Sequence, residues 1–202
     1  MFMFIKKSNF FQNLKKNRLF SLILHLINQQ KRNISDYLGS IITRNWNRAP
    51  GDSIIIGDPH DLEEVLQIYH SLFDGKSDRT FRHYSKIFKH IFYLAKSESE
   101  IVGYCVYYIK PFFSLTDIKK VAVLYSIGIK KEYQSQGIGK KLLLNSIQEM
   151  KLNNIAEIIL FVNVKNIYAL ALYKSLGFKI FNEIDNVCGD GERCYDMRLS
   201  LL

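Results

Sequence analysis

A glycine-bearing turn between a predicted strand and a predicted helix has the residue types needed to bind a phosphate group. Its sequence is Gln134-Ser135-Gln136-Gly137-Ile138-Gly139-Lys140. Glycine at 137 and 139 leaves no Cβ between the backbone and an approaching ligand. The amides at the start of the following helix, predicted over 138–152, can then bind an anion. The alternative interpretation is a tight turn that serves only the packing of the strand against the helix.

A second candidate site lies on a helix predicted between Asn166 and Gly177. Asn166 is a typical N-cap residue, and Gly177 is typical of the position that follows a helix. Asn166, Ala169 and Tyr173 are spaced i, i+3 and i+7, so they share one face of this helix. A polar cap, a small residue and a tyrosine on one face suit contact with a ligand. The alternative is that Tyr173 packs in the core with its hydroxyl hydrogen-bonded.

Strands and helices alternate along the chain and position both candidate sites. Asp58 and Pro59 predict the start of a first helix, as its N-cap and first helical residue, and Gly75 predicts its end. The other predicted elements are a helix at 80–90 and strands at 53–56, 91–96, 101–110, 119–129 and 156–162. Because the helix 138–152 connects the last two strands, these strands should lie parallel in one sheet.

The composition indicates a globular protein with a basic N-terminal segment. The chain has 202 residues, of which 48% are hydrophobic and 23% charged, so it can form a packed core. Its net charge is +9, and residues 1–50 carry nine basic residues against a single acid, Asp36. The charge therefore belongs to this segment and not to the rest of the chain. The apolar run 19–27 is too short to cross a bilayer, so no transmembrane span is predicted.

The chain is expected to divide into a basic extension, 1–50, and a domain, 51–202, joined at Pro50-Gly51-Asp52. Three interpretations of the extension stay open. It is an amphipathic helix that docks on the domain, a contact for an anionic surface or a nucleic acid, or an upstream segment without function.

The cysteines do not form a recognisable pattern. Cys105, Cys188 and Cys194 are odd in number and have no Cys-x-x-Cys spacing. This argues against a disulfide framework or a zinc site. It predicts a reducing compartment, the cytoplasm, and no metal centre.

Together, the two motifs resemble those of the GNAT superfamily of acetyl-CoA-dependent N-acetyltransferases. The family's pyrophosphate motif, Gln/Arg-x-x-Gly-x-Gly/Ala, matches Gln134, Gly137 and Gly139. Its later motif, Asn-x-x-Ala-x-x-Leu-Tyr-x-x-x-Gly-Phe, matches Asn166, Ala169, Leu172, Tyr173, Gly177 and Phe178. The resemblance covers about residues 53–202. It implies an α/β fold with a twisted, mixed, largely antiparallel sheet, whose two parallel central strands splay apart, flanked by helices.

The resemblance also implies how acetyl-CoA would bind as a cosubstrate. Pantetheine would bond to the strand backbone at Ile127, Gly128 and Ile129, whose amides would also stabilise the oxyanion. The pyrophosphate would lie on the amides of Gln134, Ser135, Gln136, Gly137, Ile138, Gly139 and Lys140. Asn166 and Ala169 would contribute to the same cofactor site. Tyr173 would protonate the leaving thiolate as general acid.

The general base and the acceptor stay open. Where many family members have a glutamate, this chain has Phe161 and the run Val123-Leu124-Tyr125-Ser126. Tyr125 or Ser126 could relay a proton through water, or both could be ordinary sheet residues. The segment 189–199 is similar to the closing hairpin of protein N-terminal (ribosomal-protein alanine) acetyltransferases, although Val187-Cys188 replaces two tyrosines. The acceptor is thus a protein α-amine, a lysine or a small-molecule amine.

Three functions follow as hypotheses. The first is an acetyl-CoA-dependent N-acetyltransferase that acts on a primary amine by direct attack. The second is a CoA-binding module of the same fold without turnover. The third is an acetyltransferase that the basic segment 1–50 recruits to RNA or to an anionic membrane, with aminoacyl-tRNA as a candidate acceptor. The sequence makes no prediction of the oligomeric state.

Overall fold

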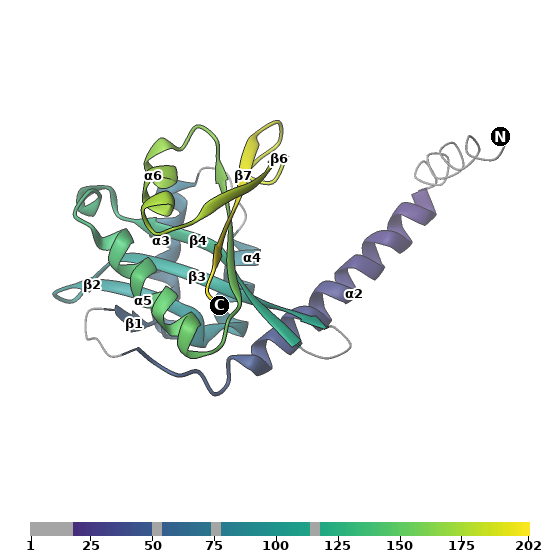
Figure 1. Cartoon of the computed structure of the whole chain (residues 1–202), viewed down its shortest axis with the longest axis horizontal. Coiled ribbons are helices and arrows are strands. Elements are labelled where there is room, and N and C mark those ends of the chain that lie inside the picture. The colour runs from purple at the N-terminus through teal and green to yellow at the C-terminus, as the bar shows by residue number, and fades with distance from the viewer. Residues whose placement is uncertain (1–17, 50–53, 74–77, 114–117) are drawn as a thin grey trace.

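The computed structural model describes residues 18–49, 54–73, 78–113 and 118–202 (Figure 1). The strands are β1 (Ile54–Ile56), β2 (Phe92–Ser97), β3 (Glu100–Phe113), β4 (Ile118–Ile129), β5 (Glu157–Asn163), β6 (Lys179–Asp185) and β7 (Arg193–Ser200). The α-helices are α2 (Arg18–Ile42), α3 (Leu62–Leu72), α4 (Arg79–Ile87), α5 (Ile138–Leu152) and α6 (Ile167–Ser175). Short 3-10 turns lie at Pro59–Asp61, Lys89–Ile91 and Lys131–Tyr133. The expected join at Pro50–Asp52 and the expected helix end at Gly75 lie outside the described residues.

The strands form one mixed sheet in the order β1-β2-β3-β4-β5-β7-β6. Only the β4–β5 pair is parallel in the described sheet, and the other neighbours are antiparallel. Helix α5 makes the crossover between β4 and β5, as a parallel connection requires. The mixed, largely antiparallel fold expected from the sequence is confirmed.

The helices cover both faces of the sheet (Figure 1). On one face, the hydroxyl of Tyr107 on β3 hydrogen-bonds that of Ser146 on α5 at 2.8 Å. On the other face, Phe81 of α4 packs against Tyr104, with ring centroids 5.3 Å apart. Because successive strand residues point to opposite faces, β3 supplies aromatic side chains to both layers. These buried rings form the centre of the hydrophobic core.

Strands β4 and β5 pair over only part of their length. The parallel pairing runs from Val121 with Glu157 to Leu124 with Leu160 and then stops, although β4 continues to Ile129. At the same point the register with β3 shifts, so that Tyr125 is an extra residue opposite β3. A bulge of this kind bends a strand and increases its local twist. The two parallel strands therefore splay apart from Tyr125 onward, as the resemblance implied.

The C-terminal half of α2 docks on the domain. Asp36 and Thr43 are buried, and a Cβ at Gly39 would lie only 2.2 Å from the carbonyl oxygen of Ile109 on β3. This close approach explains why glycine is needed at position 39. Asp36 also lies 3.1 Å from Nε2 of His83 on α4.

A buried carboxylate holds the segment that follows α2. Glu149 of α5 is 3% exposed and accepts hydrogen bonds from Trp46 Nε1 at 2.9 Å and from the Tyr93 hydroxyl at 2.9 Å. Arg48 donates to the same carboxylate at 3.2 Å, as does the amide of Ala49. The expected boundary near residue 50 stays a prediction, but the packing contacts of the domain extend back to Asp36.

This packing predicts different effects for two truncations. Removing residues 1–48 deletes the buried Trp46 side chain and leaves Glu149 short of donors, so the free energy of unfolding should fall by about 3 kcal/mol or more. Removing residues 1–34 keeps Trp46 and the donors to Glu149, so the free energy of unfolding should change by about 1 kcal/mol or less. Urea unfolding of the two variants and the full chain measures the difference. Equal stability of the two variants would show that Trp46 and Arg48 contribute nothing to folding.

Candidate active site

A cleft of about 720 Å³ lies where β4 and β5 splay apart. Its volume is within the usual range for small-molecule and cofactor sites. The lining comes from α3, β3, both splayed strands, α6 and the connection between β6 and β7. Residues from elements on both faces of the sheet, such as α3 and α6, therefore meet in the gap between the two strands.

The helix α6 places its predicted ligand face in this cleft. Asn166, Ala169 and Tyr173 all line it. Asn166 is the N-cap, since its Oδ1 accepts from the amide of Ala169 at 3.1 Å. Gly177 ends the helix with a φ of 93°, a conformation that glycine adopts without strain. Tyr173 is buried, and burial raises the pKa of its hydroxyl above the usual value, so the phenol stays protonated at neutral pH.

The predicted phosphate-binding turn caps the N-terminus of α5. Gly137 is the N-cap with a φ of 80°, and its carbonyl accepts from the amide of Lys141 at 3.0 Å. A Cβ at Gly137 would meet no atom within 4 Å, and one at Gly139 would make only ordinary contacts of 3.7 Å or more. Neither glycine is therefore required by strand–helix packing, which was the alternative interpretation. The turn is open to solvent at the end of the helix where an anion is favoured.

Side-chain contacts hold this turn against the end of β4. Gln134 donates from Nε2 to the carbonyl of Ile129 at 3.0 Å. Just before the turn, Tyr133 and Lys130 both donate to Glu100, at 2.9 and 2.7 Å. The glutamine of the first motif thus has a visible structural role, which is to join the turn to the strand that leads into the cleft.

The splay leaves one edge of β4 without a strand partner. From Ser126 to Ile129, β4 pairs with β3 but not with β5. Ile127 lines the cleft, while Gly128 lies against Tyr104 and Leu72, where a Cβ would come within 2.8 Å of either side chain. Backbone groups on a free edge can bind an extended ligand as an additional strand would.

The cleft contains more aromatic residues than the sequence analysis singled out. Tyr69 of α3 and Tyr108 of β3 line it together with Tyr125 and Phe161. Burial raises the pKa of Tyr69, Tyr108 and Tyr125 above the usual value. Tyr69 follows the helical spacing of a core residue, so its position along the chain gave no signal that it would reach the cleft. Ser126 also lines the cleft, and its hydroxyl is 3.0 Å from that of Tyr104.

The connection between β6 and β7 closes one side of the cleft. Asn186, Val187, Cys188, Gly189 and Glu192 line it. The amide of Asn186 donates to the carbonyl of Glu192, and Asn186 Oδ1 accepts from the amide of Gly191 at 2.7 Å. Glu192 is the only charged side chain among the described residues that line the cleft.

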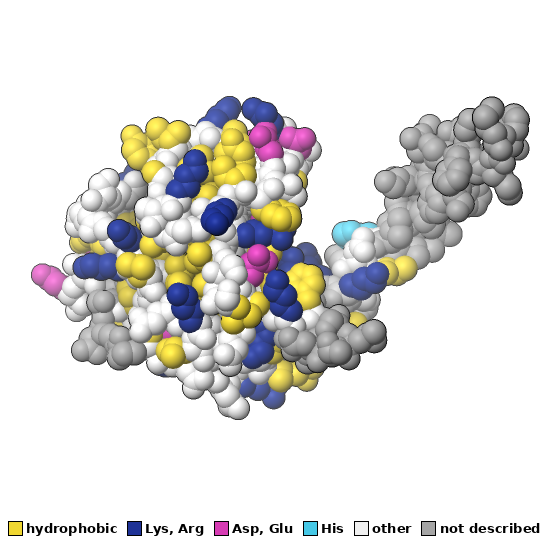
Figure 2. Space-filling view, in the orientation of Figure 1, with side chains coloured by type: hydrophobic (Ala, Val, Ile, Leu, Met, Phe, Trp, Pro, Cys, Tyr) yellow, Lys and Arg dark blue, Asp and Glu magenta, His cyan; other side chains and the backbone are white. Residues whose placement is uncertain are grey.

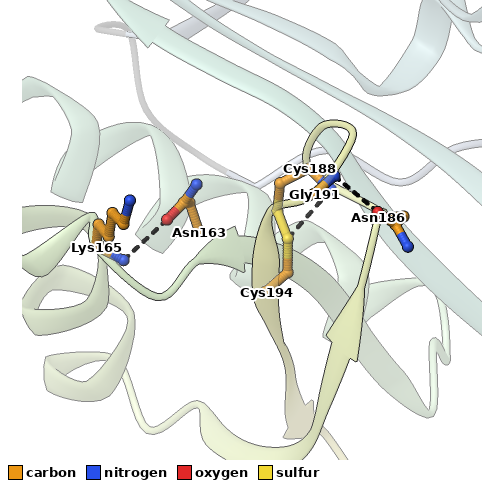
Figure 3. The surroundings of a disulfide bond; sticks show 6 residues. All are labelled: Asn163, Lys165, Asn186, Cys188, Gly191 and Cys194. Atoms are coloured by element: carbon orange, nitrogen blue, oxygen red, sulfur yellow. Dashed lines mark hydrogen bonds between the residues drawn. A yellow bond between two sulfur atoms is a disulfide. The ribbon is translucent and has the colours of Figure 1, made fainter.

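The prediction of no disulfide is wrong for one pair of cysteines. Cys188 and Cys194 are bonded, with their Cα atoms 6.2 Å apart (Figure 3). The chain reverses between them, so two residues six positions apart come within bonding distance. Cys105 is free and buried. The inference of a reducing compartment from the cysteines therefore loses its basis, and the cytoplasmic location stays a prediction.

Two further features concern metals and membranes. Within the described residues, no group of three or more metal-ligating side chains comes together. No described helix is both long and apolar enough to cross a bilayer.

Residues 61–178 match the model of the acetyltransferase (GNAT) family. An N-alpha-acetyltransferase from Sulfurisphaera tokodaii is 35% identical over 70% of this chain and 88% of its own length. One from Sulfolobus acidocaldarius is 29% identical over 79% of this chain and 99% of its own length. Arabidopsis thaliana Naa50 in complex with a bisubstrate analogue, CoA-Ac-MVNAL, has a similar fold. The TM-score is 0.64 at 21% identity, covering 73% of this chain and 97% of that one.

Proposed function

Because the chain belongs to the acetyltransferase (GNAT) family, we propose that it acetylates the α-amine at the N-terminus of a protein or peptide. As a member of this family it is an acetyl-CoA-dependent N-acetyltransferase, with acetyl-CoA as cosubstrate. The proposal concerns the acceptor and the residues that act on it. Two relatives named N-alpha-acetyltransferase, at 35% and 29% identity, support it.

The open turn before α5 fits the pyrophosphate of acetyl-CoA. Space for an anion exists at Gly137, where a Cβ would meet nothing within 4 Å, and the neighbouring amides begin a helix. We assign the pyrophosphate to the amides of 134–140, with Lys140 and Lys141 exposed beside them. The pantetheine arm is assigned to the free edge of β4 at Ile127, Gly128 and Ile129. Asn166 and Ala169 complete the lining on the α6 side.

The observation that carries the choice of acceptor is the scarcity of proton acceptors in the cleft. Burial raises the pKa of all four lining tyrosines, Tyr69, Tyr108, Tyr125 and Tyr173, so each stays protonated. No histidine or aspartate lines the described cleft, and Glu192 is its one carboxylate. Glu192 suits an acceptor that arrives as a cation.

An α-amine needs less help with deprotonation than a lysine. With a pKa of about 7.8, roughly a third of an α-amine is neutral at pH 7.5, against about one in a thousand for a lysine of pKa about 10.4. A cleft that supplies no strong base therefore favours the acceptor that loses its proton most easily. This difference supports a protein or peptide N-terminus over a lysine or an aliphatic polyamine.

The chain's own residues then act on the reacting atoms in sequence. As the nitrogen attacks the thioester, a C–N bond forms and amides of the Ile127–Ile129 segment stabilise the oxyanion. The C–S bond then breaks, and the protonated Tyr173 donates its proton to the leaving thiolate. The nitrogen's excess proton passes to solvent, for which Tyr125 and Ser126 offer a path through water, and a proton from solvent returns Tyr173 to its protonated form.

The pH dependence of the reaction tests this proposal. We expect kcat/KM for a peptide with a free α-amine to rise tenfold per pH unit and to level off near pH 8, the pKa of the amine itself. For a peptide whose α-amine has a lower pKa, the pH at which kcat/KM levels off should fall by the difference between the two α-amine pKa values. A profile with a fixed pKa near 5 to 6 for both peptides would instead identify a base on the enzyme, and would contradict the base-poor cleft.

A further inference from the structure

Helix α2 uses only one of its faces to contact the domain. Asp36 and Gly39 form that face, and Thr43, the first residue after α2, continues it. In Figure 1 the helix crosses the end of the sheet and then extends away from it toward the N-terminus. The opposite face of α2 therefore points away from the domain along the described helix.

That opposite face carries a stripe of exposed hydrophobic residues. The apolar stripe consists of Leu26, Ile27, Ile34, Tyr37 and Ile41, each between 40% and 60% exposed. Viewed along the helix axis, successive residues are turned by about 100°, and these five side chains then lie within an arc of about 100°. The centre of this arc is about 160° around the helix from the docked face. Isolated exposed hydrophobics are normal, but five aligned along one helix mark an interaction surface.

The charges beside the stripe are positive. Lys31 on α2 and Arg44 in the turn that follows it are exposed, whereas Arg32 lies on the side of the helix that faces Tyr84 and Tyr108 of the domain. The one acid within the described residues 18–49 is Asp36, which is buried against His83 and so contributes no exposed negative charge. Figure 2 shows basic and hydrophobic side chains next to each other on the projecting part of the helix.

We propose that the apolar stripe of α2 binds the surface of an anionic lipid bilayer, lying in the plane of the interface. An interfacial helix combines an apolar face with basic residues beside it, as α2 does. A second copy of the chain would bring the same positive charges together, and a nucleic acid would leave the isoleucines and leucine in contact with water. An anionic bilayer offers acyl chains to the apolar stripe and negatively charged headgroups to the basic residues.

Vesicle flotation of the full chain tests this interaction. The protein should float with vesicles of phosphatidylcholine and phosphatidylglycerol, and much less with phosphatidylcholine alone. Raised salt should weaken the binding because the basic residues are exposed. Ile27→Glu with Ile34→Glu should weaken it by about tenfold or more, since it removes apolar area and adds charge to the stripe.

Two further variants separate the stripe from general electrostatics. Gln29→Glu with Asn33→Glu adds the same two charges to the same helix at exposed polar positions, and should weaken binding by about threefold or less. Ile34→Ser with Tyr37→Ser removes apolar area without adding charge, and should weaken binding by about tenfold. All of these positions are exposed, so the melting temperature should stay unchanged in each variant.

Several results would overturn the proposal. One is the absence of flotation with anionic vesicles at low salt. Another is equal loss of binding in the two glutamate pairs, which would reduce the interaction to charge alone. A sedimentation experiment in which the full chain self-associates, and the Ile27→Glu, Ile34→Glu variant does not, would assign the stripe to a second copy. Binding of RNA that depends on the stripe would assign it to a nucleic acid.

Discussion

Replacing Tyr173 by phenylalanine is expected to lower kcat by about 10²–10⁴ while leaving the affinity for acetyl-CoA nearly unchanged. The substitution removes one oxygen and keeps the ring, which packs 5.8 Å from the ring of Phe178. Burial keeps the hydroxyl protonated at neutral pH, so it is available to the leaving thiolate. Without this proton donor the thiolate must leave as an anion in a partly apolar cleft, which is costly.

Tyr168 provides a matched control on the same helix. It is 84% exposed and does not line the cleft, so Tyr168→Phe should leave both kcat and affinity unchanged. Single-turnover rates and calorimetric titration with acetyl-CoA measure the two quantities for each variant. A Tyr173→Phe enzyme with the turnover of the unmodified chain would make Tyr173 a core residue without a catalytic role.

The second large effect is expected at Gly137. A glutamate there should weaken acetyl-CoA binding by about hundredfold or more, because its carboxylate would lie where the pyrophosphate meets the helix amides. The positive φ of 80° also strains any side chain other than glycine, so backbone strain needs its own control.

Gly191 offers that control, because its φ is also positive and its Cβ position is also open. It has a φ of 73°, and a Cβ there would also meet no atom within 4 Å. Gly191→Glu therefore carries the same strain and the same charge at a position outside the turn, and acetyl-CoA affinity should stay within about twofold. Equal affinities for the Gly137→Glu protein and the unmodified chain would remove the turn from the cofactor site.

The elements that carry the two motifs were predictable because their signals are local. The cap at Asn166, the glycine after α6 and the apolar spacing of α5 each depend on residues within a few positions of one another. The parallel pairing of β4 and β5 followed from one more rule, since a helix lies between them. The family resemblance placed the two motifs at one site. Asn166, Ala169 and Tyr173 line the cleft, whereas none of the residues 134–140 does, so a site shared by both motifs stays a prediction.

The features that escaped prediction depend on contacts between distant parts of the chain. Glu149 gave no sign that it would meet Trp46, a residue 103 positions away. The extra residue at Tyr125 is defined only by the register between two strands, which a single strand's sequence does not contain. Cys188 and Cys194 come together because β6 and β7 form a hairpin around them, so the count of cysteines alone was misleading.

The position of the acetyl group on a peptide that carries both a free α-amine and one internal lysine tests the proposed function most directly. The full chain is incubated with this peptide and labelled acetyl-CoA at pH 7.5, and fragmentation mass spectrometry locates the label. The base-poor cleft predicts label on the α-amine, and no transfer to the same peptide once its N-terminus is blocked. Label on the lysine, or binding of acetyl-CoA without transfer to either amine, would contradict N-terminal acetylation.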